Sequence, residues 1–190
     1  MDKVARFAPR DRSDLFRAAA EAKGVSVQII EKDFWVCWVL RQLYTLGGLP
    51  APIYFKGGTS LSKAFGVIDR MSEDIDLVID REALGFTGDR DPSAEELSNK
   101  ARNRLIDELK QVAANYVHGT LHPALRERFR DRLPDEPGWS LDANVENRFV
   151  LCGFVIGIAC HGIDPRSILT GTAGRQATER LANQLGLLVG

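Results

Sequence analysis

The sequence predicts an α+β protein in which helices pack on a small mixed sheet and a helical region precedes that sheet. Three observations lead to this prediction: long stretches with apolar residues at three- and four-residue steps, two short runs that favour extended backbone, and glycine-containing turns. The composition is that of a folded domain, since 44% of the 190 residues are hydrophobic and 27% are charged. We expect a helical region over 1–50, a core with a helical insertion over 51–145, and an unassigned tail over 146–190.

Two helices are expected before residue 50. Ser13 is a suitable N-cap for the first, and Gly24 suits the left-handed turn that ends a helix. The second helix should run from Ser26 to about Leu46, because its apolar residues recur at helical spacing. Its aromatic side chains are expected in the hydrophobic core and not as platforms for nucleic-acid bases; they belong to Phe34, Trp35 and Trp38.

Two strands should follow, one over Ile53–Lys56 and one over about Asp74–Ile79, because both runs are rich in residues that favour extended backbone. The chain between them contains a glycine pair and then a segment, Ser60–Phe65, with the character of a short helix. A loop rich in glycine and aspartate is expected over 85–93.

The next part of the chain is expected to be helical. Ser93 and Glu96 form a capping-box pattern for a long helix that continues to about Val117. The pair His118-Gly119 should interrupt this helix, and a further helix should follow and end before the next prolines.

The last part of the chain is less regular. A strand is a candidate at Trp139–Leu141, and from about Val145 onward the glycines are scattered without strand or helix rhythm, apart from a candidate helix over 175–185. The longest apolar run, Phe149–Cys160, is too short to span a bilayer and is broken by glycines. The sequence therefore predicts no association with a membrane.

Charge and cysteine content limit the classes of function. The chain has 25 Lys+Arg and 26 Asp+Glu, a net charge of -1, so any contact with a polynucleotide must be local. One basic cluster could meet RNA phosphates, but acidic residues interrupt it and a solvated face is favoured; it consists of Arg126, Arg128, Arg130 and Arg132. The three cysteines form no CxxC pair, and the N-terminus lacks the apolar core of a signal peptide, so we expect a cytoplasmic protein.

Asp74 and Asp76 give the first chemical signal. Residues two apart on a strand face the same side, so these carboxylates should project together while the apolar residues beside them face the other way. Two adjacent carboxylates repel each other unless a cation lies between them. Mg²⁺ binds one or two carboxylates together with phosphate oxygens and water, which makes the pair a candidate magnesium site. Two exposed acids on a polar strand face are the alternative.

The run Gly57-Gly58-Thr59-Ser60 gives the second signal. Glycines let the backbone turn sharply and approach a ligand closely. A helix that begins at Ser60 would direct its free N–H groups and its positive dipole end toward this turn, and Lys63, one turn along, could reach a phosphate. An ordinary strand–turn–helix with a serine cap is the alternative.

The two signals are more specific together than either is alone. A phosphate-binding turn after one strand, with paired carboxylates on the neighbouring strand, would place a triphosphate and metal ions in one pocket. In-line transfer of a nucleotidyl group needs that arrangement. The sequence contains no GxxxxGK[ST] motif, so phosphate binding by a P-loop is excluded.

The segment Phe55–Leu77, FKGGTSLSKAFGVIDRMSEDIDL, resembles the AbiEii/AbiGii family of abortive-infection toxins, the toxins of type IV toxin–antitoxin pairs. That family is part of the DNA polymerase β-like nucleotidyltransferase superfamily. The resemblance is dense over 29–79, including Glu31-Lys32-Asp33, and looser to about Leu141. It implies a nucleotidyltransferase-type sheet and a magnesium-dependent transfer of an NMP from an NTP. It further implies an RNA acceptor, notably the 3′ end of tRNA, and an antitoxin encoded nearby.

The resemblance also assigns the site residues by position. Asp74 and Asp76 would hold the metal ions, and with Lys63 they would form the catalytic set. Arg70 could equally be a structural ion-pair partner of Glu73. The residues assigned to the nucleotide are Gly57, Gly58, Thr59, Ser60, Lys63 and Arg70.

A third carboxylate on a later strand is the remaining part of the family pattern. Asp142 and Glu146 are the candidates, although either is more simply a surface acid. Without a third ligand, the chain could be a catalytically impaired remnant of the fold that binds a nucleotide or a partner, which is the alternative function. His118 and His122 are four apart, but the glycine between them disfavours a helical metal pair, and exposed histidines are expected; His161 has no ligand partners at metal spacing.

Overall fold

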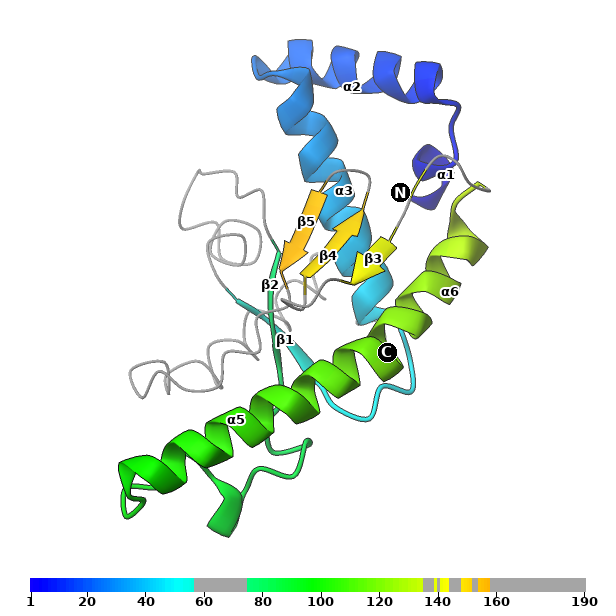
Figure 1. Cartoon of the computed structure of the whole chain (residues 1–190). Coiled ribbons are helices and arrows are strands. Elements are labelled where there is room, and N and C mark those ends of the chain that lie inside the picture. Colours follow the sequence, from blue (N-terminus) through cyan, green and yellow to red (C-terminus); the bar gives the residue numbers. More distant parts are fainter. Residues whose placement is uncertain (57–74, 135–138, 140, 144–147, 152–153, 158–190) are drawn as a thin grey trace, which may run out of the picture.

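The computed structural model describes residues 1–56, 75–134, 139, 141–143, 148–151 and 154–157, and Figure 1 shows their arrangement. The helical elements are α1 (Asp2–Ala5), α2 (Pro9–Lys23), α3 (Val27–Tyr44), η1 (Gly88–Arg90), α5 (Asn99–Tyr116), η2 (Val117–Leu121) and α6 (His122–Arg132). The strands are β1 (Ile53–Lys56), β2 (Asp76–Ile79), β3 (Leu141–Ala143), β4 (Arg148–Leu151) and β5 (Phe154–Gly157). The described chain is therefore α+β, as predicted. The expected helices over 60–65 and 175–185 lie outside the described residues.

Helices α2 and α3 form the N-terminal pair that the sequence predicts. The hydroxyl of Ser26 accepts a hydrogen bond from the backbone N–H of Ile29 over 3.4 Å, which confirms the start of α3. Gly24 ends α2 in the left-handed conformation, with φ of 67°. The predicted start of α2 is wrong, because the helix begins at Pro9 and Ser13 lies inside it. Proline is favoured in the first turn, where its missing N–H would have no helical partner.

The N-cap of helix α5 lies five residues after the predicted cap. The hydroxyl of Ser98 accepts from the N–H of Ala101 over 3.3 Å and caps the helix. Ser93 belongs to the preceding loop, where it donates to Asp91 over 2.7 Å and accepts from Arg81 over 3.2 Å. The predicted capping box is therefore wrong, because the hydroxyl of its serine is already bonded within the loop.

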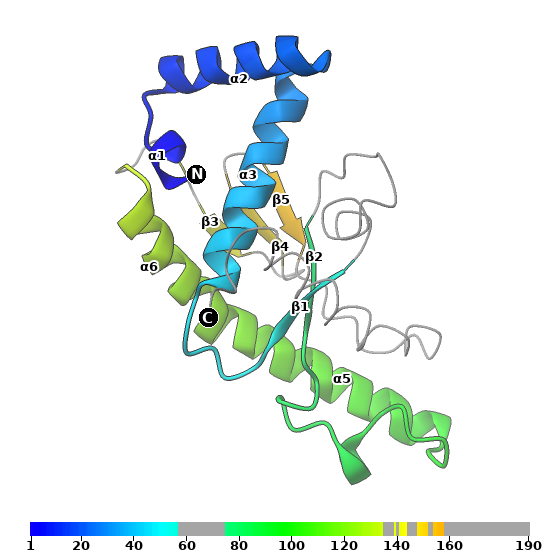
Figure 2. The ribbon, with the colours of Figure 1, turned by 180° about the vertical axis from the view of Figure 1, so that it is seen from behind.

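The expected break at His118-Gly119 is confirmed only in part, because a π-helical segment separates α5 from α6 there but the chain stays helical. Helix α5, η2 and α6 follow one another without interruption and form one bent rod along one side of the molecule (Figures 1 and 2). The η2 segment is a π-helix, which is wider than an α-helical turn and changes the angular relation between the helices on its two sides. Val117 and Leu121, at its two ends, are fully buried and hold it against the core.

The strands form two small sheets. β1 and β2 are antiparallel, and β3, β4 and β5 form a second antiparallel sheet in that order. Every strand pair in the described part of the chain is antiparallel, so the predicted mixed sheet is not found there. The expectation of a chain without strand rhythm after Val145 is wrong, because β4 and β5 form a hairpin. Their aromatic and β-branched residues favour extended backbone despite the nearby glycines. The strand expected at Trp139–Leu141 is shifted, since β3 begins at Leu141.

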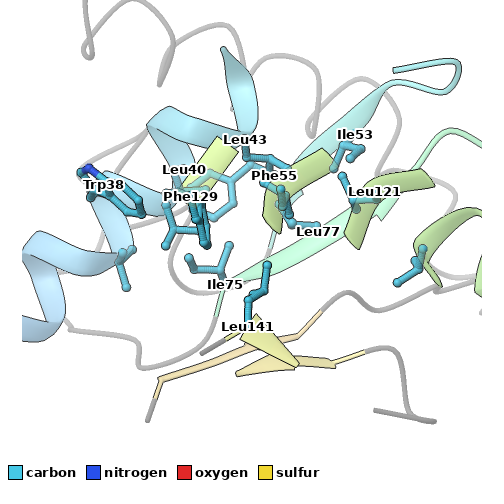
Figure 3. Packing of buried hydrophobic residues seen from close by; sticks show 14 of the residues in the cluster. Trp38, Leu40, Leu43, Ile53, Phe55, Ile75, Leu77, Leu121, Phe129 and Leu141 are labelled. Carbon is cyan, nitrogen blue, oxygen red and sulfur yellow. The ribbon is translucent and has the colours of Figure 1, made fainter. Parts of the chain in front are cut away.

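One hydrophobic core joins α3, the rod, β1, β2 and β3 (Figure 3). Trp38 of α3 and Phe129 of α6 are fully buried, and so is Phe55 of β1. Trp35 is 4% exposed, and Phe34 packs against the core from its edge. The prediction that these aromatic residues of α3 are structural is confirmed.

Candidate functional site

The backbone register of β1 and β2 defines the candidate site. The two strands pair from Ile53 opposite Ile79 to Lys56 opposite Asp76. Asp76 is the one predicted site residue that lies on a described strand, and it begins β2. The other predicted site residues lie outside the described residues; they are Gly57, Gly58, Thr59, Ser60, Lys63, Arg70 and Asp74.

The pairing of Lys56 with Asp76 relates the two halves of the predicted motif. The glycine turn begins at the residue after Lys56, and the Asp-x-Asp motif ends at Asp76. Because these two residues face each other across the ladder, the segment 57–74 leaves β1 and enters β2 at the same end of the sheet. The sequence motif alone does not give this register.

Burial alternates along both strands. Phe55 is fully buried, Leu77 is 1% exposed, and Ile75, just before β2, is 2% exposed, so one set of positions faces the core. Tyr54 and Val78, which alternate with them, are half-buried. This confirms that the apolar positions of the motif form the core side of the ladder.

Asp80 is a carboxylate that sequence reasoning missed. It follows β2, and its Oδ2 accepts a hydrogen bond from the phenol of Tyr54 over 2.9 Å. Its Oδ1 accepts from the backbone N–H groups of Glu82 and Ala83, over 2.8 and 3.4 Å. These bonds fix the turn after β2, so Asp80 is structural. Within the described ranges, no three His, Cys, Asp or Glu side chains come together as metal ligands would.

Of the two candidates for a third carboxylate, one lies on a described strand and the other does not. Asp142 lies on β3 opposite Val150 of β4, whereas Glu146 lies outside the described residues. Leu141, next to Asp142, is 2% exposed and packs in the core. Its carbonyl lies 3.0 Å from Nε2 of His122.

The histidines behave differently from each other. His118 is exposed, as expected. The expectation that His122 is exposed is wrong: its side chain is half-buried, and its ring contacts the backbone of β3. No local pattern indicates this contact, because the two partners are 19 residues apart in the chain. His161 lies outside the described residues.

Comparison with protein families supplies the remaining information. The family model for the nucleotidyl transferase AbiEii toxin of type IV TA systems matches residues 38–152, which is more than half of the chain. The chain belongs to the AbiEii family. The match includes β1, β2, the helical rod and β3, and it begins after Glu31-Lys32-Asp33. No curated protein and no solved structure matches the chain.

Membership of the AbiEii family indicates the general type of reaction. It implies nucleotidyl transferase toxin activity, with an NTP as substrate and an antitoxin as partner. Nucleotidyl transferases generally use a divalent metal ion. Asp74, Asp76 and Asp142 all fall inside the matched range.

The arginines of α6 are partly engaged in the fold of this AbiEii protein. Arg128 donates to the carbonyl of Thr45 over 2.7 Å, and Arg132 lies 3.2 Å from the carboxylate of Asp2. Arg130 is exposed. The expectation of a solvated arginine face is therefore correct only in part. None of the helices in the described portion of the AbiEii chain has the length and apolar character needed to cross a bilayer.

Two titratable groups outside the motif are shifted by their surroundings. Burial raises the pKa of the Cys37 thiol above its ordinary value of 9.0. Burial also raises the pKa of the Tyr116 phenol, while its hydrogen bond to the Ala51 carbonyl acts in the opposite direction. The phenol donates to that carbonyl over 2.9 Å in a buried position. The raised pKa of each group favours its neutral, protonated form.

Proposed function

We propose that this AbiEii protein is a magnesium-dependent, cytoplasmic toxin that transfers an NMP from an NTP to an RNA acceptor. The 3′ end of tRNA is the acceptor proposed. The oxygen of the acceptor hydroxyl forms a bond to the α-phosphorus, and pyrophosphate leaves. The catalytic core lies over 51–145, after the helical region 1–50 and before the tail 146–190.

The pairing of Lys56 with Asp76 is the observation that supports this proposal most directly. It brings the start of the glycine turn and the end of the Asp-x-Asp motif to one end of the β1–β2 ladder. A nucleotide held by the turn would therefore lie at the same end of the sheet as the carboxylates. Transfer within one pocket requires this proximity.

The donor set fits Mg²⁺. Asp74 and Asp76 supply carboxylate oxygens, the ligand type that Mg²⁺ prefers. Position 76 on β2 is in step with Val78, which is half-buried, and out of step with the core residue Leu77. A metal ion bound there supplies charge neutralisation at the triphosphate.

The remaining motif residues are assigned to binding and orientation. Gly57, Gly58, Thr59 and Ser60 hold the triphosphate through backbone N–H groups and hydroxyls. Lys63 contacts a phosphate as a point charge. Arg70 binds the nucleotide, and its alternative role is an ion pair with Glu73.

A pair of matched substitutions on one strand tests the proposal. Asp76→Asn removes a proposed metal ligand and should lower NMP transfer by about two to three orders of magnitude. Asp80→Asn is the control, because Asp80 lies just beyond the same strand and its carboxylate is bonded to Tyr54. Transfer is measured with each α-labelled NTP, Mg²⁺ and total RNA, and thermal unfolding checks that both variants are folded.

The outcomes separate the two functions. Loss of transfer in Asp76→Asn with retention in Asp80→Asn supports the proposal. Full activity of folded Asp76→Asn would overturn the site assignment. Nucleotide binding by the unaltered chain, without metal-dependent turnover on any RNA tested, would replace the proposal with the alternative of a catalytically impaired remnant.

A further inference from the structure

The carboxylate of Asp2 lies in a cradle of three side-chain donors. The indole N–H of Trp38, the amide of Gln42 and the guanidinium of Arg132 donate to it over 3.0, 3.0 and 3.2 Å. Trp38 and Gln42 are buried and lie one turn apart on α3, whereas Arg132 ends α6 at the surface. The side chain of Asp2 is itself 29% exposed, so the cradle opens to solvent on one side.

A second contact of the N-terminal segment lies at the C-terminal end of α6. Arg6, which follows α1, donates to the carbonyls of Asp131 and Arg132 over 2.8 and 2.9 Å. The last carbonyls of a helix have no helical partner, and the helix dipole favours a cation there. Ala5 is 1% exposed and belongs to the core cluster. The segment therefore matches its site by charge at two places and by apolar contact at a third.

Residues 1–7, here called the N-terminal clasp, have little structure of their own. Their one helix, α1, has four residues and no side-chain cap. A helix of this length is not stable alone in water. The carbonyls of Ala5 and Phe7 accept from Arg12 of α2 over 3.2 and 3.3 Å. The clasp is thus held in place by contacts with the rest of the chain, and chain ends held in this way open locally before the whole fold does.

The cradle and the clasp differ in their relation to the family match. Trp38, Gln42 and Arg132 lie within the matched residues 38–152, whereas the clasp precedes them. Figures 1 and 2 show α1 beside the end of α6, where the rod stops. The matched part of the chain therefore forms the site, and a short segment outside that part fills it.

We propose that the N-terminal clasp is a tethered ligand of a peptide-binding surface on α3 and α6, and that a partner protein displaces it with a segment of the same chemistry. That segment carries a carboxylate for the cradle and an arginine four residues later for the C-terminal carbonyls of α6, as Asp2 and Arg6 do. The exchange keeps the buried donors of the cradle satisfied, since one carboxylate replaces another. This proposal does not depend on nucleotidyl transfer.

Chemical rescue tests the cradle in the full chain. Asp2→Ala removes the carboxylate and leaves space for formate, which is a carboxylate without a side chain. Sodium formate should raise the unfolding temperature of this variant by about 2–4 °C more than equimolar sodium chloride does. The unaltered chain and Asp14→Ala, at an exposed ion pair of α2, should respond equally to the two salts. An equal response of Asp2→Ala to the two salts would overturn the assignment of a carboxylate site.

Hydrogen exchange in the unaltered chain tests displacement and needs no variant to fold. The probe is a synthetic peptide with the sequence of residues 1–8, MDKVARFA, and the control peptide carries Asp2→Ala. The peptides are added at concentrations on the order of 10 mM, because a short tether gives the clasp a millimolar effective concentration. The backbone N–H groups of Arg6 and Phe7, which bond within the clasp, should exchange about 10-fold faster with the probe, while the indole N–H of Trp38 stays protected.

The possible results are distinct. Faster exchange of the clasp with a protected Trp38, seen with the probe and not with the control peptide, supports displacement. Equal effects of the two peptides would overturn the role of the carboxylate. Clasp amides that exchange as slowly as that of Leu40 in the core, with no response to the probe, would show that the clasp opens only with the whole fold and would overturn the proposal. Faster exchange of Trp38 together with the clasp would also overturn it, because the peptide would then unfold the region without filling the cradle.

Discussion

The carboxylate of Asp2 accepts a hydrogen bond from the indole N–H of Trp38 over 3.0 Å, although 36 residues separate them in the chain. The same oxygen accepts from the amide of Gln42, also over 3.0 Å, and the other oxygen lies 3.2 Å from Arg132. Gln42 is 2% exposed and is buried together with otherwise apolar residues. One side chain of the short helix α1 therefore joins α3 to α6.

Asp2→Ala should lower the free energy of unfolding by about 1–3 kcal/mol. The loss comes mainly from the N–H groups of Trp38 and Gln42, which would remain without their acceptor. The ion pair with Arg132 contributes less, because that side chain is 41% exposed. Urea unfolding followed by tryptophan fluorescence gives the measurement.

The matched control for this prediction is Asp14→Ala. Asp14 pairs with Arg17 over 2.9 Å on the surface of α2, with side chains 57% and 67% exposed. Its loss should change the free energy of unfolding by no more than about 0.5 kcal/mol. Equal effects of the two substitutions would show that the contacts of Asp2 do not join the helices in solution.

The free energy of unfolding should decrease above about pH 9, owing to Cys37 and Tyr116. Burial raises the pKa of both groups above their ordinary values of 9.0 and 10.0, so the folded chain keeps protons that the unfolded chain releases. Their contribution is fully present below those ordinary values and is lost as the pH rises through the raised values. Urea unfolding measured between about pH 7 and 11 follows the loss.

Two substitutions separate the alkaline effects. Cys37→Ala should remove the part of the slope that begins near 9.0, and Tyr116→Phe the part that begins near 10.0. Tyr116→Phe should also destabilise the protein by about 1–3 kcal/mol at neutral pH, because the buried Ala51 carbonyl loses its partner. An alkaline slope that neither substitution alters would assign the effect to other groups.

The sequence correctly predicts those elements that are marked by caps, glycine turns or runs of β-favouring residues within the element itself. Ser26 marks the start of α3, Gly24 the end of α2, and the β-rich runs correspond to β1 and β2. The errors arose where a tertiary or loop contact outweighed the pattern. Ser93 is bonded within its loop, and the glycine at 119 is accommodated by a π-helix inside a continuous rod.

The candidate site also has a part that local sequence patterns predict and a part that depends on tertiary structure. Its residue types were readable as a motif, and the range of the family match includes that motif. The register that opposes Lys56 and Asp76 depends on strand pairing, and the bond from His122 to β3 depends on packing between distant elements. A pattern of residue types along the chain contains neither relationship. The assignments over 57–74 stay predictions, because those residues lie outside the described structure.

The start of α5 is tested by comparing two serines. Ser98→Ala should destabilise the protein by about 1 kcal/mol, because it leaves a helical N–H group without its cap. Ser93→Ala should reduce helix content less, since that hydroxyl bonds to Asp91 and Arg81 in the loop. Circular dichroism and urea unfolding measure both effects. Greater loss of helix in Ser93→Ala would restore the capping box of the sequence prediction.

Phe129→Ala should be the most damaging single change in the core. The ring of Phe129 is fully buried, with its centroid 5.0 Å from that of Trp38 and 6.0 Å from that of Trp139. Its removal would separate α6 from α3 and leave a cavity between two large rings. The free energy of unfolding should therefore decrease by about 3–5 kcal/mol. Leu15→Ala is the control: that residue is 42% exposed, and its substitution should change the free energy of unfolding by no more than about 0.5 kcal/mol.

The same substitution distinguishes a single core from two independent ones. Trp38 belongs to the helical region over 1–50, whereas Phe129 belongs to the predicted catalytic core over 51–145. Because both residues lie in one core cluster, Phe129→Ala should lower the midpoint of unfolding of both parts together. Tryptophan fluorescence and helix content, measured during the same urea titration, follow the two parts. Two separate transitions, with the N-terminal helices unaffected, would show that the parts fold independently.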